Sequence, residues 1–390
     1  MKKILLLSVL CAVNIISARS QEPVLPFSMV QQPFSWYKQQ SAAWRSVIDK
    51  QPADARAWFN YYYANRLLQK FDQEDKRPAG EKAAAMEQLL KEMGTSIPDS
   101  YEYNLVRWMA GGIDMKNLPY LKKAMELGPG RTEHLDAAMN IAELQRDHKS
   151  KLSFARKKYD AKLVSPGMLH YNYNVLTGLP QNAILITAGD NDTYPAWVLQ
   201  SLGHRTDVKV INIFLLQSDE YRKKLFEELG VAPWEDLWKN DQAASDAALT
   251  RFRKGILRHL AANRHNHPVM LALSAGNLIE ESEPSVEGQL YLTGLAFQYS
   301  GQPLDNIGML RANFEKNFVL DYLEHSFYPD VSGQMVRQMN MNYIVPMMKL
   351  YDHYRDAGDR QRLDWIARKL AAVSNGTPAE EEVNAHMKQQ

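Results

Sequence analysis

The spacing of apolar residues changes once along this chain, and the change limits the folds it can adopt. From residue 34 to about residue 163, apolar side chains recur every three or four positions, as in the stripe of Trp44, Val47 and Ile48. This spacing places them on one face of a helix. After Pro180 the apolar residues instead form short unbroken runs, which are typical of buried strands. The sequence therefore predicts an α/β centre with all-α regions on either side.

The unbroken apolar runs alternate with segments of helical pattern. The runs lie in residues 183–187, 208–214, 269–273 and 289–299. Helical patterns separate the first three, near residues 193–202, 219–229 and 244–262. Apolar strands that alternate with helices favour a parallel sheet joined by right-handed crossovers. We expect a Rossmann-like parallel sheet of about four strands.

The flanking helical segments carry a partial tetratricopeptide pattern. Pro52 is followed six positions later by Trp58, and Pro129 is followed at the same distance by Leu135. In such repeats a proline ends one helix before a large apolar residue opens the next. The interval between the two prolines is not a multiple of the repeat period, so an ordinary helical bundle remains the alternative.

The predicted organisation has five parts. They are a signal peptide (1–20), a helical tetratricopeptide-like (TPR-like) domain (21–164), a Rossmann-like α/β domain (165–305), a C-terminal helical hairpin domain (306–375) and a disordered tail (376–390). Apolar faces around Tyr351 and Ile366, on either side of Gly358, indicate the hairpin. Pro346 is expected in the first turn of its helix or at a kink.

The first twenty residues have the pattern of a secretory signal. Lys2 and Lys3 precede an apolar run, and Ala18 and Ser20 supply the small residues that a signal peptidase reads. We expect cleavage after Ser20 and a location in the periplasm or outside the cell. Cleavage would remove Cys11, the one cysteine of the sequence, so no disulfide or thiol chemistry is expected in the mature chain.

Charge and hydropathy argue against two classes of partner. The signal holds three of the 46 basic residues and none of the 45 acidic ones, so its loss moves the formal net charge from +1 to −2. A nearly neutral chain has no general electrostatic attraction to nucleic acid, which is not expected as a partner. No later stretch is apolar for long enough to span a bilayer, so no transmembrane segment is expected after signal cleavage.

Polar residues follow the first predicted strand, where a helix should begin. We call Asp190, Asn191, Asp192 and Thr193 the strand-end loop; after the third strand come Ser274 and Asn277. Ligands of open parallel sheets bind at the carboxyl ends of the strands, so all of these residues are predicted to bind a ligand. Two carboxylates near a helix N-terminus would repel a bare phosphate, and a sugar hydroxyl, an amine or a divalent cation fits better.

The strand-end loop also has a purely structural interpretation. Asp192 or Thr193 can cap a helix that begins near residue 193, and Pro195 suits the first turn of that helix. A cap uses one side chain, whereas this loop offers four. The surplus favours a binding role without excluding the structural one.

Familiar catalytic and metal-binding signatures are missing from the sequence. The first strand is not followed by a dinucleotide-binding glycine motif, and there is no phosphate-binding loop, His-Glu-x-x-His or Gly-x-Ser-x-Gly. Two groups of weak metal ligands, interpreted as ordinary loop and core residues, are His259, His265 and His267, and Met335, Met339 and Met341. No cofactor and no catalytic residue is assigned.

Three segments carry a family resemblance: 189–200, 203–212 and 215–216. They resemble the soluble C-terminal region of large Bacteroidota membrane proteins related to protein O-mannosyltransferases. In those proteins a multi-spanning glycosyltransferase-like region precedes the Gly-Asp-Asn-Asp-Thr segment, and helical repeats follow it. The resemblance implies an envelope location and a link to glycan or glycoprotein handling. The membrane region, where family catalysis would be expected, has no counterpart here, so no catalytic residue is carried over.

The leading interpretation is an exported, non-catalytic interaction or scaffold protein. Its helical repeats would bind a protein partner, and its α/β part would bind a small polar ligand, a sugar or a divalent cation, through the strand-end loop. The alternative is a metal-assisted hydrolase or transferase acting on a glycan or phosphoester, in which Asp190 and Asp192 hold a metal or serve as acid and base. In a third interpretation the loop is a capped turn and nothing more.

Overall fold

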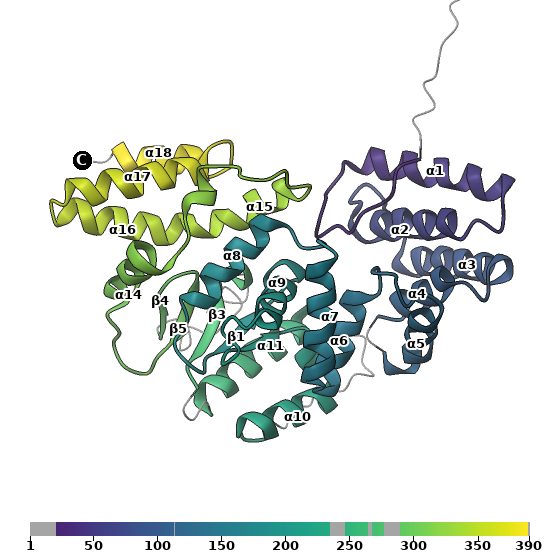
Figure 1. The fold of residues 1–390 in the computed structure, drawn as a ribbon, viewed down its shortest axis with the longest axis horizontal. Coiled ribbons are helices and arrows are strands. Elements are labelled where there is room, and N and C mark those ends of the chain that lie inside the picture. The colour runs from purple at the N-terminus through teal and green to yellow at the C-terminus, as the bar shows by residue number, and fades with distance from the viewer. Residues whose placement is uncertain (1–20, 113, 235–245, 264–266, 277–288, 389–390) are drawn as a thin grey trace, which may run out of the picture. The chain divides into compact units, whose positions relative to one another are not determined.

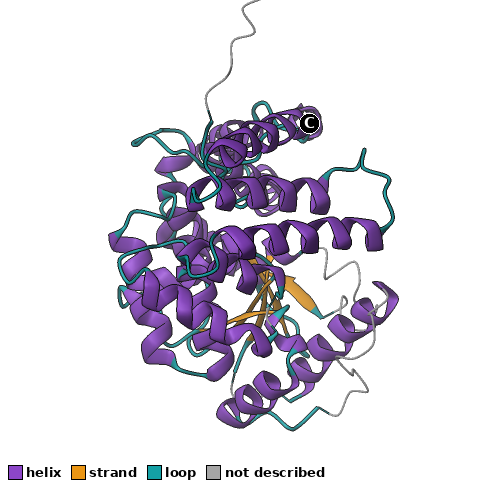
Figure 2. Cartoon of the chain, turned by 90° about the vertical axis from the view of Figure 1, so that its right-hand side faces the viewer, coloured by secondary structure: helices purple, strands orange, loops and turns teal. Residues whose placement is uncertain are grey.

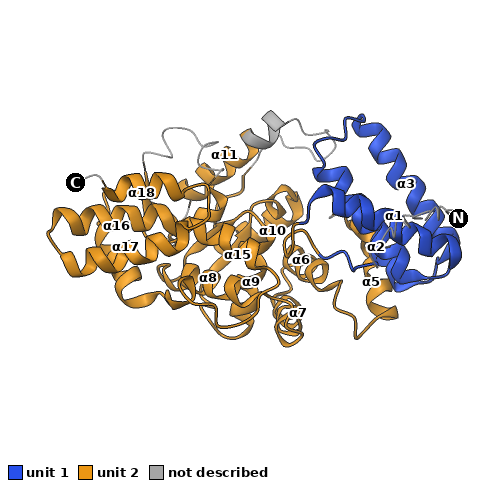
Figure 3. Ribbon diagram, turned by 90° about the horizontal axis from the view of Figure 1, so that it is seen from above, with its two compact units in different colours: residues 1–25, 32–106 blue, residues 26–31, 107–390 orange. Residues whose placement is uncertain are grey.

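The computed structural model describes residues 21–112, 114–234, 246–263, 267–276 and 289–388. The predicted signal peptide, His265 and Asn277 lie outside the described residues. The chain divides into two units, coloured separately in Figure 3: residues 1–25 with 32–106, and residues 26–31 with 107–390. The division falls inside the helical region predicted for residues 21–164.

The first unit is helical in its described residues. It contains α1, α2, α3 and the first part of α4, at Phe34–Lys50, Ala55–Phe71, Ala79–Ser96 and Tyr101–Ala110. Helices α1 and α2 pack side by side (Figure 1). Asp54 caps α2 by accepting the N–H of Ala57 at 2.9 Å, and Trp58 Nε1 donates to the carbonyl of Pro52 at 2.8 Å. The predicted helix junction at Pro52 is therefore confirmed.

The second unit contains the sheet and most of the helices. Its helices are α5 (Leu118–Leu127), α6 (Leu135–Gln145), α7 (His148–Asp160), α8 (Pro166–Thr177), α9 (Asp190–Ser201), α10 (Asp219–Leu229), α11 (Asp246–Ala262), α14 (Asn306–Ala312), α15 (Gly333–Asn340), α16 (Ile344–Asp356), α17 (Arg360–Ser374) and α18 (Glu380–Lys388). Its strands are β1 (Ile184–Thr187), β2 (Lys209–Asn212), β3 (Val269–Ala272), β4 (Leu290–Leu292) and β5 (Ala296–Tyr299). Short 3-10 turns lie at Met115–Asn117, Leu215–Gln217, Leu273–Ala275, Asp321–Leu323 and Met341–Tyr343, and a π-helical turn at Asn313–Asn317.

The described strands form one mixed sheet in the order β2-β1-β3-β5-β4. The α/β plus all-α class is confirmed, and β1 pairs in parallel with β2 and β3 as predicted. The expectation of about four parallel strands is wrong at one edge. The fourth apolar run forms two strands, and β5 is antiparallel to both β3 and β4. Residues 293–295 join β4 to β5, and this connection is too short for the crossover that a parallel pair needs.

Helices cover the sheet (Figures 1 and 2), and β1 is an inner strand between β2 and β3. All four residues of β1 are fully buried. Right-handed crossovers place α9, between β1 and β2, and α11, before β3, on opposite faces. Helices α7 and α8 pack on α9. Strand β2 forms one edge, and its outer side faces the turn between α6 and α7.

The C-terminal helices form the predicted hairpin and one further helix. Helices α16 and α17 pack together on either side of Gly358, and Pro346 lies in the first turn of α16. The tail predicted to be disordered contains α18 instead. Val383 of α18 is fully buried, and the Tyr351 hydroxyl donates to the carbonyl of Met387 at 2.9 Å. Val383 and polar contacts such as the one between His386 and Asp352, at 2.9 Å, thus dock the last helix on the hairpin.

Candidate functional site

The strand-end loop lies at the carboxyl end of β1, as predicted, but the helix begins inside it. Gly189 is the N-cap of α9 and Asp190 is its first residue. The predicted start near residue 193 is therefore wrong, and Pro195 is the sixth helical residue instead of a first-turn residue. Because Pro195 has no N–H, the carbonyl of Asn191 loses its helical partner, and Asn172 Nδ2 donates to that carbonyl at 2.8 Å.

The carboxylate of Asp192 is 3% exposed and accepts four hydrogen bonds. The backbone N–H groups of Ala188 and Gly189 donate at 3.0 and 2.8 Å, and the hydroxyls of Ser274 and Thr193 donate at 2.7 and 3.2 Å. The bond from Gly189 is the side-chain-to-N-cap half of a capping box. Burial raises the pKa of Asp192, and the hydrogen bonds partly offset that rise.

Side-chain hydrogen bonds join the carboxyl ends of all three parallel strands. The hydroxyls of Thr187, in β1, and Thr193 lie 2.7 Å apart. Asn212, at the end of β2, donates from Nδ2 to Thr193 Oγ1 at 3.0 Å. Ser274, just after β3, bonds to Asp192. The convergence of the strand ends follows from the parallel topology, and here the polar groups that meet there satisfy one another.

Asp190 and Asn191 are the loop residues that face outward. Asp190 is exposed, and half-buried Asn191 donates from Nδ2 to the carbonyl of Ser28 at 3.0 Å. Both line a cavity of about 40 Å³ together with Tyr194. That volume admits a few water molecules and is too small for a sugar.

The hydroxyl of Tyr194 belongs to the same cavity lining as Asp190. It accepts a hydrogen bond from Asn140 Nδ2 at 2.7 Å. Burial raises the pKa of Tyr194 well above its ordinary value, and the charges of Asp190 and Asp136 add to the rise. This hydroxyl therefore keeps its proton at neutral pH and cannot serve as a base there.

From the two groups of weak metal ligands, the structure places His259 in α11 and Met335 in α15. His259 stacks on Phe226, and its Nε2 lies 2.7 Å from the carbonyl of Ala232. Met335 is buried in α15. Within the described ranges, no group of three or more His, Cys, Asp or Glu side chains is placed to hold a metal ion. None of the helices in those ranges is long and apolar enough to cross a membrane.

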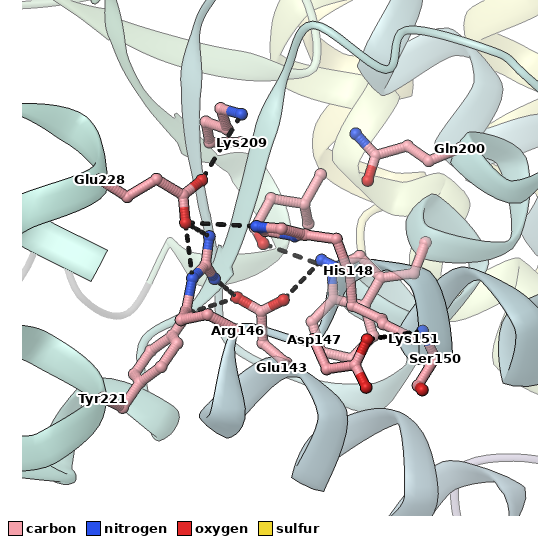
Figure 4. Close-up of polar contacts among 12 residues, drawn as sticks. Glu143, Arg146, Asp147, His148, Ser150, Lys151, Gln200, Lys209, Tyr221 and Glu228 are labelled. Atoms are coloured by element: carbon pink, nitrogen blue, oxygen red, sulfur yellow. Dashed lines mark hydrogen bonds and ion pairs between the residues drawn. The ribbon is translucent and has the colours of Figure 1, made fainter. Parts of the chain in front are cut away.

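A second polar cluster, which the sequence analysis missed, lies at the outer edge of β2 (Figure 4). A cavity of about 170 Å³ is lined there by Glu143, Arg146 and Lys151 from α6, α7 and their connecting turn, and by Lys209 from β2. The one sequence signal is Lys209, a charge inside an apolar run. Its neighbours come from α6 and α7, much earlier in the chain, and from α10, later in the chain. Only the position of β2 at the sheet edge brings them together.

Comparison with known families places the strand-end loop and β2 in one matched segment. The model of a family described as TMEM260-associated domain 2 matches residues 168–234. This segment begins inside α8 and runs through β1, the strand-end loop, α9 and β2 to just beyond α10. Comparison with curated proteins gives no match. A minority of the chain, which includes the strand-end loop and the β2 wall of the second cluster, is thus similar to the TMEM260-associated domain 2 family.

Proposed function

We propose that this chain is an exported, non-catalytic interaction protein that acts in envelope glycan or glycoprotein handling. The observation that carries the proposal is the internal hydrogen bonding of Asp192, whose carboxylate meets four donors of its own chain. A metal-assisted or acid–base enzyme at this loop would need that carboxylate free to contact a metal ion or substrate. We infer that Asp192 holds the strand ends and α9 together.

The proposal of a small-ligand site in the strand-end loop narrows to Asp190 and Asn191. These two residues border the cavity of about 40 Å³, whereas Asp192 and Thr193 are buried. Of the ligand classes considered, a divalent cation or an amine matches the volume and the exposed carboxylate better than a sugar does.

Helix α17 carries a surface with the composition of a protein contact site. Trp365 is half-buried in an open hollow of about 420 Å³ that Arg362 and Arg368 also line. Arg362 is held by Asp359 and by Glu315. Tryptophan and arginine are the residue types that most often dominate binding energy at protein interfaces. This surface supports a protein partner for the C-terminal helical hairpin.

Support for a role in glycan handling comes from two similarities. Residues 168–234 match the TMEM260-associated domain 2 family. Segments 189–200, 203–212 and 215–216 resemble the soluble region of Bacteroidota proteins related to protein O-mannosyltransferases. The basic, apolar N-terminal twenty residues support export to the compartment where such proteins act.

The proposal is tested by affinity capture from an envelope fraction, followed by binding measurements with the purified partner. Trp365→Ala should weaken the partner's affinity about thirtyfold or more, because a central tryptophan contributes about 2 kcal/mol or more. Tyr328→Ala is the matched control, since Tyr328 is an aromatic residue that is 67% exposed and lies outside α17. Asp190→Asn should capture the partner normally. Turnover of a glycan or phosphoester that disappears in Asp190→Asn would reject the non-catalytic function in favour of the hydrolase or transferase.

A further inference from the structure

The cavity of about 170 Å³ lies against the outer edge of β2, within the second unit. We call it the edge cavity, and the lining residues that matter are Arg146, His148, Lys151, Gln200, Lys209 and Val210. Arg146 and His148 flank the turn between α6 and α7, and Lys151 follows one helical turn later. Figure 4 shows the labelled basic side chains gathered around two carboxylates.

The first carboxylate, Glu143, is 1% exposed and fully engaged. It accepts hydrogen bonds from the guanidinium of Arg146, the ammonium of Lys151 and, at 2.7 Å, the hydroxyl of Tyr221. Burial acts to raise the pKa of Glu143, but the positive charges of Lys151 and Arg146 outweigh burial, and the pKa is lowered. Glu143 is therefore an ionised internal partner of two cations.

The second carboxylate, Glu228, lies among three basic groups. Arg146 Nη2 donates to its Oε2 at 2.8 Å, and His148 Nε2 lies 3.2 Å from the same oxygen. Lys209 Nζ is 3.8 Å from Oε1, which is too far for a hydrogen bond. Lys209 is therefore attracted to Glu228 without being bound by it.

Around the edge cavity there are more positive charges than negative ones. There are also more N–H donors than the carboxylates accept. Arg146, Lys151 and Lys209 supply three positive charges against the two carboxylates of Glu143 and Glu228. An ammonium group has three N–H donors, and Glu143 takes one from Lys151, whose side chain is only 9% exposed. The Trp197 ring lies 5.1 Å from the same ammonium and partly offsets its burial. A ring face does not take up both remaining N–H donors, so an acceptor in the cavity would complete the shell.

The edge of β2 adds a neutral donor to the same wall. The N–H of Lys209 bonds toward β1, so the next residue, Val210, directs its N–H outward. The outward carbonyls of Val208 and Val210 accept from Gln200 Nε2 at 2.7 Å and from Trp197 Nε1 at 3.3 Å. The acceptors of this edge are therefore occupied, while a donor faces the cavity, and this arrangement suits an anion.

The backbone at Arg146 shows that its side chain is held in place. Arg146 ends α6 in the left-handed conformation, with φ 59°, at a position where glycine is the usual residue. Its guanidinium bridges Glu143 and Glu228 and lies 5.6 Å from the Tyr221 ring. Arg146 thus fixes both carboxylates, and Lys151 and Lys209 keep donors for a ligand.

We propose that the edge cavity binds a small oxyanion of the phosphate or sulfate type. The ammonium groups of Lys151 and Lys209 and the N–H of Val210 would hold the anion. Such an anion is either free or the terminal group of a larger molecule such as a phosphorylated sugar. The proposal goes beyond the interaction function, because none of these residues lies on α17.

The test is calorimetric titration of the purified chain with inorganic phosphate, sulfate and glucose 1-phosphate at low and constant ionic strength. Lys209→Gln should weaken phosphate binding about tenfold, the loss of one charged contact. Lys224→Gln is the matched control and should bind like the wild type: Lys224 also faces one carboxylate, Glu220, and its side chain is 42% exposed against 36% for Lys209.

Glu228→Gln is a second test, in which the affinity for phosphate should rise instead of fall. Its result does not depend on whether Lys209→Gln folds correctly. Loss of the competing carboxylate should tighten phosphate binding several-fold. Equal affinity for phosphate and glucose 1-phosphate would assign the site to the free anion, and tighter binding of the sugar phosphate would assign it to a phosphorylated glycan. The absence of binding to any of the three probes, or an equal loss in Lys224→Gln, would overturn the proposal and leave a structural ion-pair network.

Discussion

The strand-end loop and the edge cavity are both polar clusters beside the same sheet, but they use their hydrogen-bonding groups differently. At the strand-end loop, four internal donors occupy the carboxylate of Asp192. At the edge cavity, Lys151 and Lys209 keep donors that Glu143 and Glu228 do not take up. A dense polar motif in a sequence can therefore form a closed site, in which the polar groups satisfy one another. A set of residues dispersed along the sequence can form an open site, in which donors remain for a ligand.

The largest effect is expected from removing the buried charge at the edge cavity. Glu143→Gln leaves the buried ammonium of Lys151 without its ionised partner and leaves Arg146 paired with Glu228 alone, which should lower the free energy of unfolding by about 3–5 kcal/mol. Urea unfolding followed by tryptophan fluorescence measures this loss. Glu126→Gln, at an exposed position in α5, is the control and should stay within about 0.5 kcal/mol of the wild type. Similar values for both variants would show that the edge cluster is not a buried ion network.

A smaller loss of unfolding free energy is expected when the hydrogen bonds of Asp192 in the strand-end loop are broken. In Asp192→Asn the amide group must face the N–H of Ala188 or of Gly189, because these donors bind different carboxylate oxygens. One buried donor is then unsatisfied, which costs about 1–3 kcal/mol. Asp190→Asn makes the same chemical change at an exposed neighbour and should cost less than about 0.5 kcal/mol. If the two variants unfold alike, Asp192 does not hold the strand ends together.

The contributions of Asp192 and Glu143 to stability should also change with pH in opposite directions. The pKa of Asp192 is raised from 3.8, so its contribution to stability is full below that value and is lost as pH rises through the folded pKa. The pKa of Glu143 is lowered from 4.5, so its contribution is present above that value and is lost as pH falls through the folded pKa.

Urea unfolding from about pH 3 to about pH 7 separates the two responses. As pH rises, the stability difference between the wild type and Asp192→Asn should narrow, and the difference between the wild type and Glu143→Gln should widen. The change in each stability difference over this pH range should be smaller than the loss that either substitution causes at neutral pH. Burial and polar contacts shift the pKa in opposite directions at both sites, so each net shift is limited. Slopes of equal sign would mean that the two carboxylates share one kind of environment.

The sequence predicted the parts of the fold that depend on local pattern. The unbroken run at 183–187 indicated β1. Ser274 was named as a candidate because it follows the third strand, but its place beside the strand-end loop depends on the pairing of β1 with β3, which the sequence left open. The start of α9 was predicted too late because Pro195 was taken as a first-turn residue. The structure tolerates Pro195 deeper in the helix, since the side chain of Asn172 satisfies the carbonyl that Pro195 leaves unpaired.

The rest of the site depended on tertiary structure that no local pattern contains. The apolar run at 289–299 gave no sign of its reversal into β4 and β5, which is set by the short turn at 293–295. The edge cavity exists because β2 lies at the sheet edge, where Lys209 meets residues of α6, α7 and α10. Strand order cannot be read from apolar runs alone, so this cluster was not predictable.

The smallest stability effect should come from Lys209→Gln. The size of this effect decides whether Lys209 is a structural partner of Glu228. Lys209 is 3.8 Å from Glu228 and its side chain is 36% exposed, so solvent screens the pair and its loss should change the free energy of unfolding by less than about 0.5 kcal/mol. Urea unfolding at neutral pH, with Lys224→Gln as control, measures the change. A loss above about 1 kcal/mol would make Lys209 a structural partner of Glu228 and the edge cavity as closed as the strand-end loop. An unchanged stability would mean that any weakening of phosphate binding in Lys209→Gln reports on the anion contact itself, because the fold that presents it is intact.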